Sequence, residues 1–283
     1  MKDAPAIRLA RIVRRLTRGA GTFLVWLLVL PLLYPFVWLI FGALWPDNQP
    51  LSLWLQSDTV RLSSANFAAA SALVPMSRFF LSSLRVVVFG LPLSLLVASW
   101  AGFAITRLPP NSRDWLVGLS VAALLAPPTA LWLARFPLFR LLGWLDTPLA
   151  LIAPALIGGS PFFVLLLYNA YRRLPDEMLE AAVLDGATLW QCWRLVALPN
   201  VAGTTGAVAI LNFLYFWNNF TDPLLYVRAV GQMTLPVGVR LLAQLDESRW
   251  PVLMAGSLIL ALPPALVFLA GQRLLREISV TLR

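Results

Sequence analysis

The sequence predicts an all-α polytopic membrane protein with six transmembrane helices. Its 283 residues are 59% hydrophobic and only 12% charged, and the mean hydropathy is +0.78. This composition is far too apolar for a soluble domain of this size. Six apolar runs are long enough to cross a bilayer, which takes about 20 residues as a helix. The arginines fall mainly at the ends of these runs, where membrane topology explains them.

Composition also excludes several functions. A formal charge of +9 would suit nucleic acid, but topology accounts for it better. Lys2 is the only lysine, so the chain does not hydrolyse ATP through a P-loop. With no histidine and Cys192 as the single cysteine, we expect no intrachain disulfide, no metal site and no catalytic residue. The energy for uphill transport must then come from another subunit or an ion.

The first half of the chain divides into a basic tail, 1–21, and the start of a transmembrane domain, 22–283. We expect the first span at 23–45, because this run is longer than the apolar region of a signal peptide and lacks a convincing cleavage site. A long polar loop, 46–79, precedes the second span at 86–105. The third span, 115–133, contains the Pro127–Pro128 pair, which predicts a break or kink there.

The second half contains three more spans. The fourth, 149–171, follows a short amphipathic stretch and is interrupted by glycines and a proline at 158–161. The fifth and sixth are expected at 201–225 and 252–271, joined by an outside loop. With both ends of the chain inside, 14 lysines and arginines lie on the cytoplasmic side and seven outside, which supports this orientation.

A polar loop, 174–200, separates the fourth and fifth spans and predicts two short helices. Pro175 suits the first position of a helix, and Gly186 can adopt the left-handed conformation that ends one. Thr188 can cap the second helix, and Pro199 closes it. The second helix has one apolar face, formed by Leu189, Cys192, Trp193 and Val196. We expect Cys192 to serve packing.

The same loop resembles the EAA motif of the membrane subunits of binding-protein-dependent ABC importers. That motif reads Glu-Ala-Ala, three residues, Gly, nine residues, Ile, one residue, Leu-Pro. The matching positions, with the residues that flank the glycine in the extended form, are Glu180, Ala181, Ala182, Asp185, Gly186, Ala187, Leu198 and Pro199, and Val196 replaces Ile. The resemblance implies that the first helix docks into a cleft of a cytoplasmic ATPase, with Glu180 facing a basic group. The alternative is an ordinary cytoplasmic loop with amphipathic helices.

The fifth span is the most polar one. Polar groups in a span usually face a bundle interior or an aqueous pathway, and the candidate pathway residues are Asn212, Trp217, Asn218 and Asp222. The stretch 216–224 is similar to a pattern of carbohydrate permeases, Trp-Asn, one residue, Phe, two residues, Pro-Leu. Helix-packing amides with an interfacial aromatic belt are an equally good alternative for any one of these residues.

Together these resemblances imply the type I ABC importer permease fold and a carbohydrate as substrate. The implied partners are an ATPase subunit in two copies, which binds ATP and Mg, a second permease subunit forming a heterodimer, and an extracytoplasmic substrate-binding protein. The chain would bind no cofactor and no nucleic acid, and would lie in a bacterial or archaeal plasma (inner) membrane with both termini cytoplasmic. The alternatives are an ABC permease for glycerol phosphate or a polyol, and an ion-coupled secondary transporter relying on Asp222.

Overall fold

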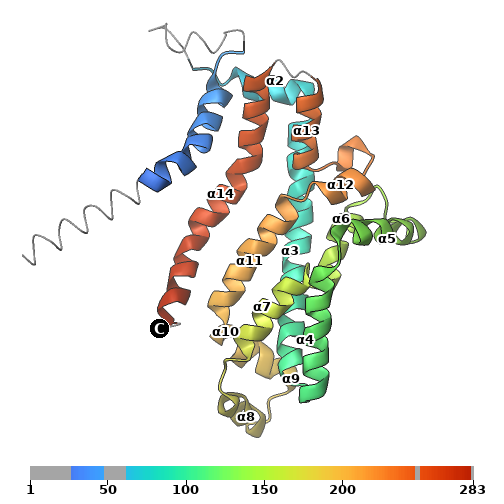
Figure 1. Cartoon of the computed structure of the whole chain (residues 1–283), viewed down its shortest axis with the longest axis vertical. Coiled ribbons are helices and arrows are strands. Elements are labelled where there is room, and N and C mark those ends of the chain that lie inside the picture. Colours follow the sequence, from blue (N-terminus) through green and yellow to red (C-terminus); the bar gives the residue numbers. More distant parts are fainter. Residues whose placement is uncertain (1–26, 48–61, 246–248, 282–283) are drawn as a thin grey trace, which may run out of the picture. The chain divides into compact units, whose positions relative to one another are not determined.

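The computed structural model describes residues 27–47, 62–245 and 249–281. Within these ranges the chain forms helices joined by loops and contains no β-strand (Figure 1). It divides into two compact units, Met1–Ala70 with Glu247–Leu258, and Ser71–Asp246 with Ile259–Arg283. The expected cytoplasmic tail, 1–21, lies outside the described residues, as does most of the polar part of the loop expected at 46–79.

Three helical segments contribute to the first unit: the helix Leu27–Leu44, most of α2 (Ala65–Leu73) and the beginning of α14 (Trp250–Thr281). Gly42 allows close packing, because a Cβ atom there would lie 2.9 Å from the ring of Trp250. The buried side chain of Asn66 donates hydrogen bonds to the carbonyls of Ala43 and Trp45, at 2.9 and 2.6 Å. These bonds satisfy backbone carbonyls that the end of the first span leaves free.

The second unit is built on α3 (Met76–Thr106). Among the helices that pack against it are α4 (Pro110–Leu125), α7 (Pro161–Tyr171) and α11 (Ala202–Trp217) (Figure 1). Small residues recur at every fourth position of α3, and all are buried: Gly90, Ser94, Ala98 and Gly102. A Cβ atom on Gly102 would lie 2.8 Å from the backbone nitrogen of Tyr168. This stripe of small residues lets helix backbones approach closely, as membrane helices require.

The third and fourth spans are both interrupted. Beyond α4 the chain turns by 96° into α5 (Pro128–Leu141), so the break expected at the proline pair is present. The fourth span consists of α6 (Pro148–Ile152), the 3-10 helix η2 (Ala153–Ile157) and α7. Gly158 and Gly159 separate η2 from α7 with φ of 78° and 76°, a left-handed conformation that glycine adopts at little cost. The predicted interruption of this span is therefore confirmed.

The rest of the second unit begins with four short helices, then continues through the fifth and sixth spans. These helices are α8 (Asp176–Leu184), α9 (Leu189–Gln191), the π-helix η3 (Cys192–Ala197) and α10 (Leu198–Asn200). An 86° bend leads from α10 into α11. The chain then forms α12 (Thr221–Tyr226), η4 (Val230–Gln232), α13 (Leu235–Leu245) and α14.

The described chain has four helices long and apolar enough to cross a membrane, and six spans if each bent pair counts as one. This confirms the expected fold class, although several boundaries were wrong. The second span begins at Met76 rather than near 86, because its polar first turns bond to the segment before α13. Ser82 donates to the carbonyl of Gly231, and Ser83 accepts from the backbone N–H of Leu235. The loop expected at 228–250 contains α13, a helix too short to span.

Candidate functional site

The loop 174–200, which resembles the EAA motif and is called the EAA loop below, begins with α8, whose first turn carries the acidic residues Asp176 and Glu177. Negative charge is favourable there because the helix N-terminus is electropositive. Pro175 is the residue before the helix rather than its first residue. Gly186 has φ of 84°, as predicted. Its N–H donates to the carbonyl of Val183, and the next N–H donates back to Ala182, a hydrogen-bond pattern that ends a helix with a left-handed glycine.

The second helical segment of the loop starts at the predicted cap. The backbone N–H of Thr188 donates to the side chain of Gln191 at 2.8 Å, and the N–H of Gln191 donates to the Thr188 hydroxyl at 3.4 Å. The next six residues, Cys192–Ala197, form a π-helix, a rare conformation that is frequent at functional sites. Cys192 is a free, buried cysteine, in agreement with a packing role.

A buried hydrogen-bond cluster ties this segment to two spans. The indole N–H of Trp193 points at the hydroxyl oxygens of Ser99 on α3 and Tyr171 on α7, at 3.1 and 3.2 Å. The two hydroxyls share a further hydrogen bond of 2.6 Å. Burial raises the strength of such bonds, because water does not compete for the groups. The π-helix of the EAA loop is therefore fixed to both α3 and α7.

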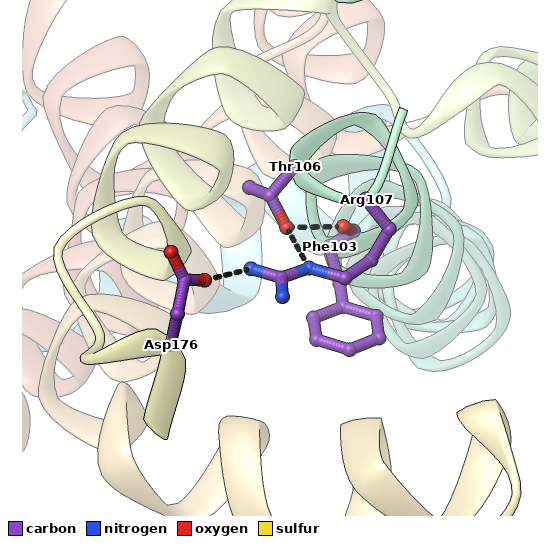
Figure 2. A network of polar contacts seen from close by, with 4 residues as sticks. All are labelled: Phe103, Thr106, Arg107 and Asp176. Atoms are coloured by element: carbon purple, nitrogen blue, oxygen red, sulfur yellow. Dashed lines mark hydrogen bonds and ion pairs between the residues drawn. The ribbon is translucent and has the colours of Figure 1, made fainter. Parts of the chain in front are cut away.

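An exposed ion pair connects α8, the first helix of the loop, to α3. Figure 2 shows Arg107, the residue that ends α3, reaching Asp176 in the first turn of α8, with 3.3 Å between the charged atoms. The guanidinium is held by its Nε, which donates to Thr106, and lies 5.8 Å from the ring centre of Phe103. The pair joins a helix C-terminus to a helix N-terminus, so each charge also suits its helix dipole.

The tip of the loop presents apolar side chains and a groove. Leu184 is 88% exposed and Val183 58%, and beyond the turn Leu189 and Trp190 are also exposed. A groove of about 390 Å³ opens between α8, the end of α3 and the second segment, and Glu180 lines it. The other motif residues are exposed at Ala181, Asp185, Gly186 and Pro199 and half-buried at Ala182, Ala187 and Leu198. An exposed apolar surface of this kind is typical of an interaction site.

The polar residues predicted in the fifth span separate into two groups. Asn212 is fully buried and donates to the hydroxyl of Ser94 on α3 at 2.7 Å. Trp217 is also buried, and its indole N–H donates to the carbonyl of Leu260 at 3.0 Å. The side chains of Asn212 and Trp217 therefore connect α11 to α3 and to α14. Neither lines the cavity described next.

Asn218 and Asp222 line a cavity of about 680 Å³. It lies where three helix breaks meet: the α4–α5 bend, the glycine pair before α7 and the α11–α12 junction. Five further polar side chains that line it were not predicted as site residues: Arg135, Ser160, Tyr215, Asn219 and Thr221. Arg135 could not be predicted, because the 96° turn between α4 and α5 does not follow from composition.

The charged groups of this cavity are held by the helices around them. The carboxylate of Asp222, only 5% exposed, accepts from the side chain of Asn219 at 2.8 Å and lies 4.0 Å from the guanidinium of Arg135. The hydroxyl of Tyr226 on α12 donates to the carbonyl of Trp132 on α5 at 2.9 Å. This bond fixes the two helices that carry the charges relative to each other.

Comparisons with known proteins agree with this architecture. The family model described as binding-protein-dependent transport system inner membrane component matches residues 90–277. The lactose transport system permease protein LacG of Rhizobium radiobacter is 27% identical over 241 residues, covering 85% of this chain and 87% of that protein. The diacetylchitobiose uptake system permease protein NgcG of Streptomyces coelicolor is 32% identical over 213 residues, covering 74% of this chain and 70% of that protein.

Among solved structures, one chain of a bacterial ABC transporter involved in the import of the acidic polysaccharide alginate has the same fold. It superimposes with a TM-score of 0.73 at 17% identity, covering 92% of this chain and 96% of that chain. The family match spans most of the transmembrane domain, including the EAA loop and the cavity. This chain therefore belongs to the family of binding-protein-dependent transport system inner membrane components.

Proposed function

We propose that this protein is the permease subunit of an ABC importer that carries a carbohydrate. It forms one half of the translocation pathway, and a second permease subunit forms the other half. An extracytoplasmic binding protein delivers the sugar, and an ATPase subunit in two copies binds and hydrolyses ATP with Mg. The chain lies in a bacterial or archaeal plasma membrane with both termini cytoplasmic, and itself binds no cofactor.

The observation that carries this proposal is the construction of the EAA loop. Its outer surface is apolar and exposed at Val183, Leu184 and Trp190, which suits a surface that a partner covers. Its inner surface is bonded to α3 through Arg107 and Trp193. Because its outer surface is open to a partner and its inner surface is bonded to α3, the loop can transmit a movement of the partner to the transmembrane helices.

The two attachments suggest how coupling works. Closure of the ATPase subunits moves α8 as a rigid body, and the ion pair to Arg107 draws the end of α3 with it. The bonds of Trp193 carry the same movement to α7, whose other end adjoins the glycine break beside the cavity. Rocking of rigid helices about such a break would open the cavity on alternate sides.

The substrate class is supported by the relatives and by the cavity. LacG and NgcG are named for lactose and diacetylchitobiose transport, and the cavity presents amide, hydroxyl and charged groups beside apolar walls. An ion-coupled mechanism is disfavoured, because Asp222 is held by Asn219 and faces a cation at 4.0 Å, which is not the arrangement of a free proton relay.

The test is purification of the membrane complex through this chain, followed by ATPase and uptake assays. We expect a nucleotide-binding subunit and a second permease to co-purify. Glu180→Lys should lower sugar-stimulated ATPase activity by roughly tenfold or more, because it reverses a charge at the docking surface. Glu177→Lys is the matched control, since Glu177 is exposed on the same helix but lies outside the motif. A chain that purifies alone and transports without ATP would contradict the proposal.

A further inference from the structure

Among the described residues that line the 680 Å³ cavity, two carry a formal charge, Arg135 and Asp222. They have opposite sign, so the cavity is formally neutral. Their separation of 4.0 Å is too long for a direct hydrogen bond. The two side chains therefore neutralise each other's charge although no hydrogen bond forms between them.

The carboxylate of Asp222 is held in place by hydrogen bonds. Asp222 is buried, and Asn219 contacts it twice: the amide nitrogen donates to the carboxylate at 2.8 Å, and the amide oxygen accepts from the backbone N–H of Asp222 at 3.1 Å. The side chain of Arg135 is 22% exposed. The carboxylate is thus fixed in the wall of the cavity, and the guanidinium beside it balances its charge.

The other polar groups suit a ligand that both donates and accepts hydrogen bonds. Asn218 is exposed, Thr221 and Tyr215 are half-buried, and all three line the cavity. Amides and hydroxyls donate and accept, as the hydroxyls of a sugar ring do. Ligand sites combine a few placed polar groups with apolar walls, and Leu131 and Ile157 supply such walls here.

We infer that this cavity binds a ring of a neutral carbohydrate, and that Asp222 makes it reject anionic solutes. The inference rests on the proposed function for the sugar itself, and adds that this subunit contacts the sugar and selects for charge. A carboxylate or phosphate on the ligand would meet the fixed carboxylate of Asp222 as a like charge, and Arg135 is already neutralised. Like charges placed close together in a binding site are strongly unfavourable.

The experiment uses the whole complex in lipid nanodiscs without the binding protein, so that only the membrane site is probed. Binding is followed by saturation-transfer NMR of methyl glucoside and methyl galactoside, each paired with its uronide, in which a carboxylate replaces the hydroxymethyl group. We expect the neutral glycosides to bind at least about tenfold more tightly than the uronides. Asp222→Asn leaves Arg135 unneutralised, and should raise the affinity for the uronides until the preference disappears or reverses.

Two further variants keep the test decisive. Asn218→Ala removes an exposed amide and should weaken binding of all four glycosides alike. Asp114→Asn is the matched control, because Asp114 also pairs with an arginine, Arg113 at 3.3 Å, but does not line the cavity. It should change neither affinity nor preference.

Absence of neutral glycoside binding, uronide binding as tight as neutral binding, or an unchanged preference in Asp222→Asn would overturn the inference. If Asp222→Asn does not assemble, an unchanged affinity in Asn218→Ala would overturn it as well. ATPase stimulation by binding protein and sugar is measured on the same preparations. If binding protein and sugar still stimulate the ATPase but the binding test fails, the inference is wrong and the proposed function stands. If the wild-type complex shows no such stimulation, the proposed function itself is wrong.

Discussion

The indole nitrogen of Trp193 lies 3.1 Å from the hydroxyl oxygen of Ser99, and this bond joins the EAA loop to α3. Ser99 belongs to the same span as Ser94 and Gly90, which pack beside the cavity-lining helices. Trp193 belongs to the π-helix, whose extra residue per turn distinguishes it from the α-helices on either side. The side chain of Trp193 thus connects the loop with α3, which packs beside helices that line the cavity.

Trp193→Phe should uncouple ATP hydrolysis from transport while leaving the complex assembled. The change removes the N–H donor but keeps an aromatic ring, and Ser99 and Tyr171 still bond to each other. The stability cost should therefore be about 0.5–1.5 kcal/mol. The measurement is the number of sugar molecules transported per ATP hydrolysed in proteoliposomes.

The control is Trp100→Phe, since the ring of Trp100 lies 5.3 Å from that of Trp193 in the same aromatic cluster, but Trp100 belongs to α3 and not to the exposed surface of the loop. It should keep the wild-type ratio. Equal ratios for both variants would show that the Trp193 hydrogen bond has no part in coupling.

Arg107→Gln should reduce coupling with little effect on stability. The ion pair with Asp176 is exposed, 75% on the aspartate side, and pairs of this kind contribute only about 0–1 kcal/mol. Its role would be geometric, because it fixes the first turn of α8 to the end of α3. The swapped double variant, Arg107→Asp with Asp176→Arg, should recover part of the lost transport per ATP. A swap no better than either single variant would exclude the pair as a coupling contact.

Local features of the EAA loop could be predicted from the sequence because they depend on neighbouring residues. The left-handed Gly186 and the Thr188 cap follow from residue type and spacing, and both are present. The π-helix was not predictable, since its six residues fit an ordinary apolar helix face. Cys192 and Trp193 are both buried in it, and their burial depends on the tertiary packing of the loop against the spans.

The cavity was only half predictable. Asn218 and Asp222 stood out as polar residues in an apolar span, whereas Asn212 and Trp217 carried the same signal but bond to neighbouring helices. Hydropathy does not distinguish a polar group that faces a cavity from one that faces another helix. Arg135 required the 96° turn after α4, which depends on how the two helices pack.

Gly102→Ala should destabilise the second unit although it adds a single methyl group. The new Cβ would lie 2.8 Å from the Tyr168 nitrogen and 3.1 Å from the Val164 carbonyl oxygen, and backbone atoms cannot move aside cheaply. We expect a loss of about 1–3 kcal/mol from overpacking, seen as a lower unfolding temperature in detergent. Gly118→Ala is the control, because nothing lies within 4 Å of its Cβ position. A fall of the same size for Gly118→Ala would contradict the close contact of α3 with α7.

Gly186→Val should abolish coupling without preventing membrane insertion. The Cβ of a substituted residue meets nothing within 4 Å, so the effect is not a clash but the φ of 84°. A β-branched residue is disfavoured there by about 1–2 kcal/mol or more, which favours an altered turn and displaces α8 from the second helix. Gly186→Asn is the control, because asparagine tolerates this conformation. Uptake should be lost for Val and largely kept for Asn, with equal amounts of protein in the membrane; normal uptake by the Val variant would mean that the angle between the two helices does not matter for coupling.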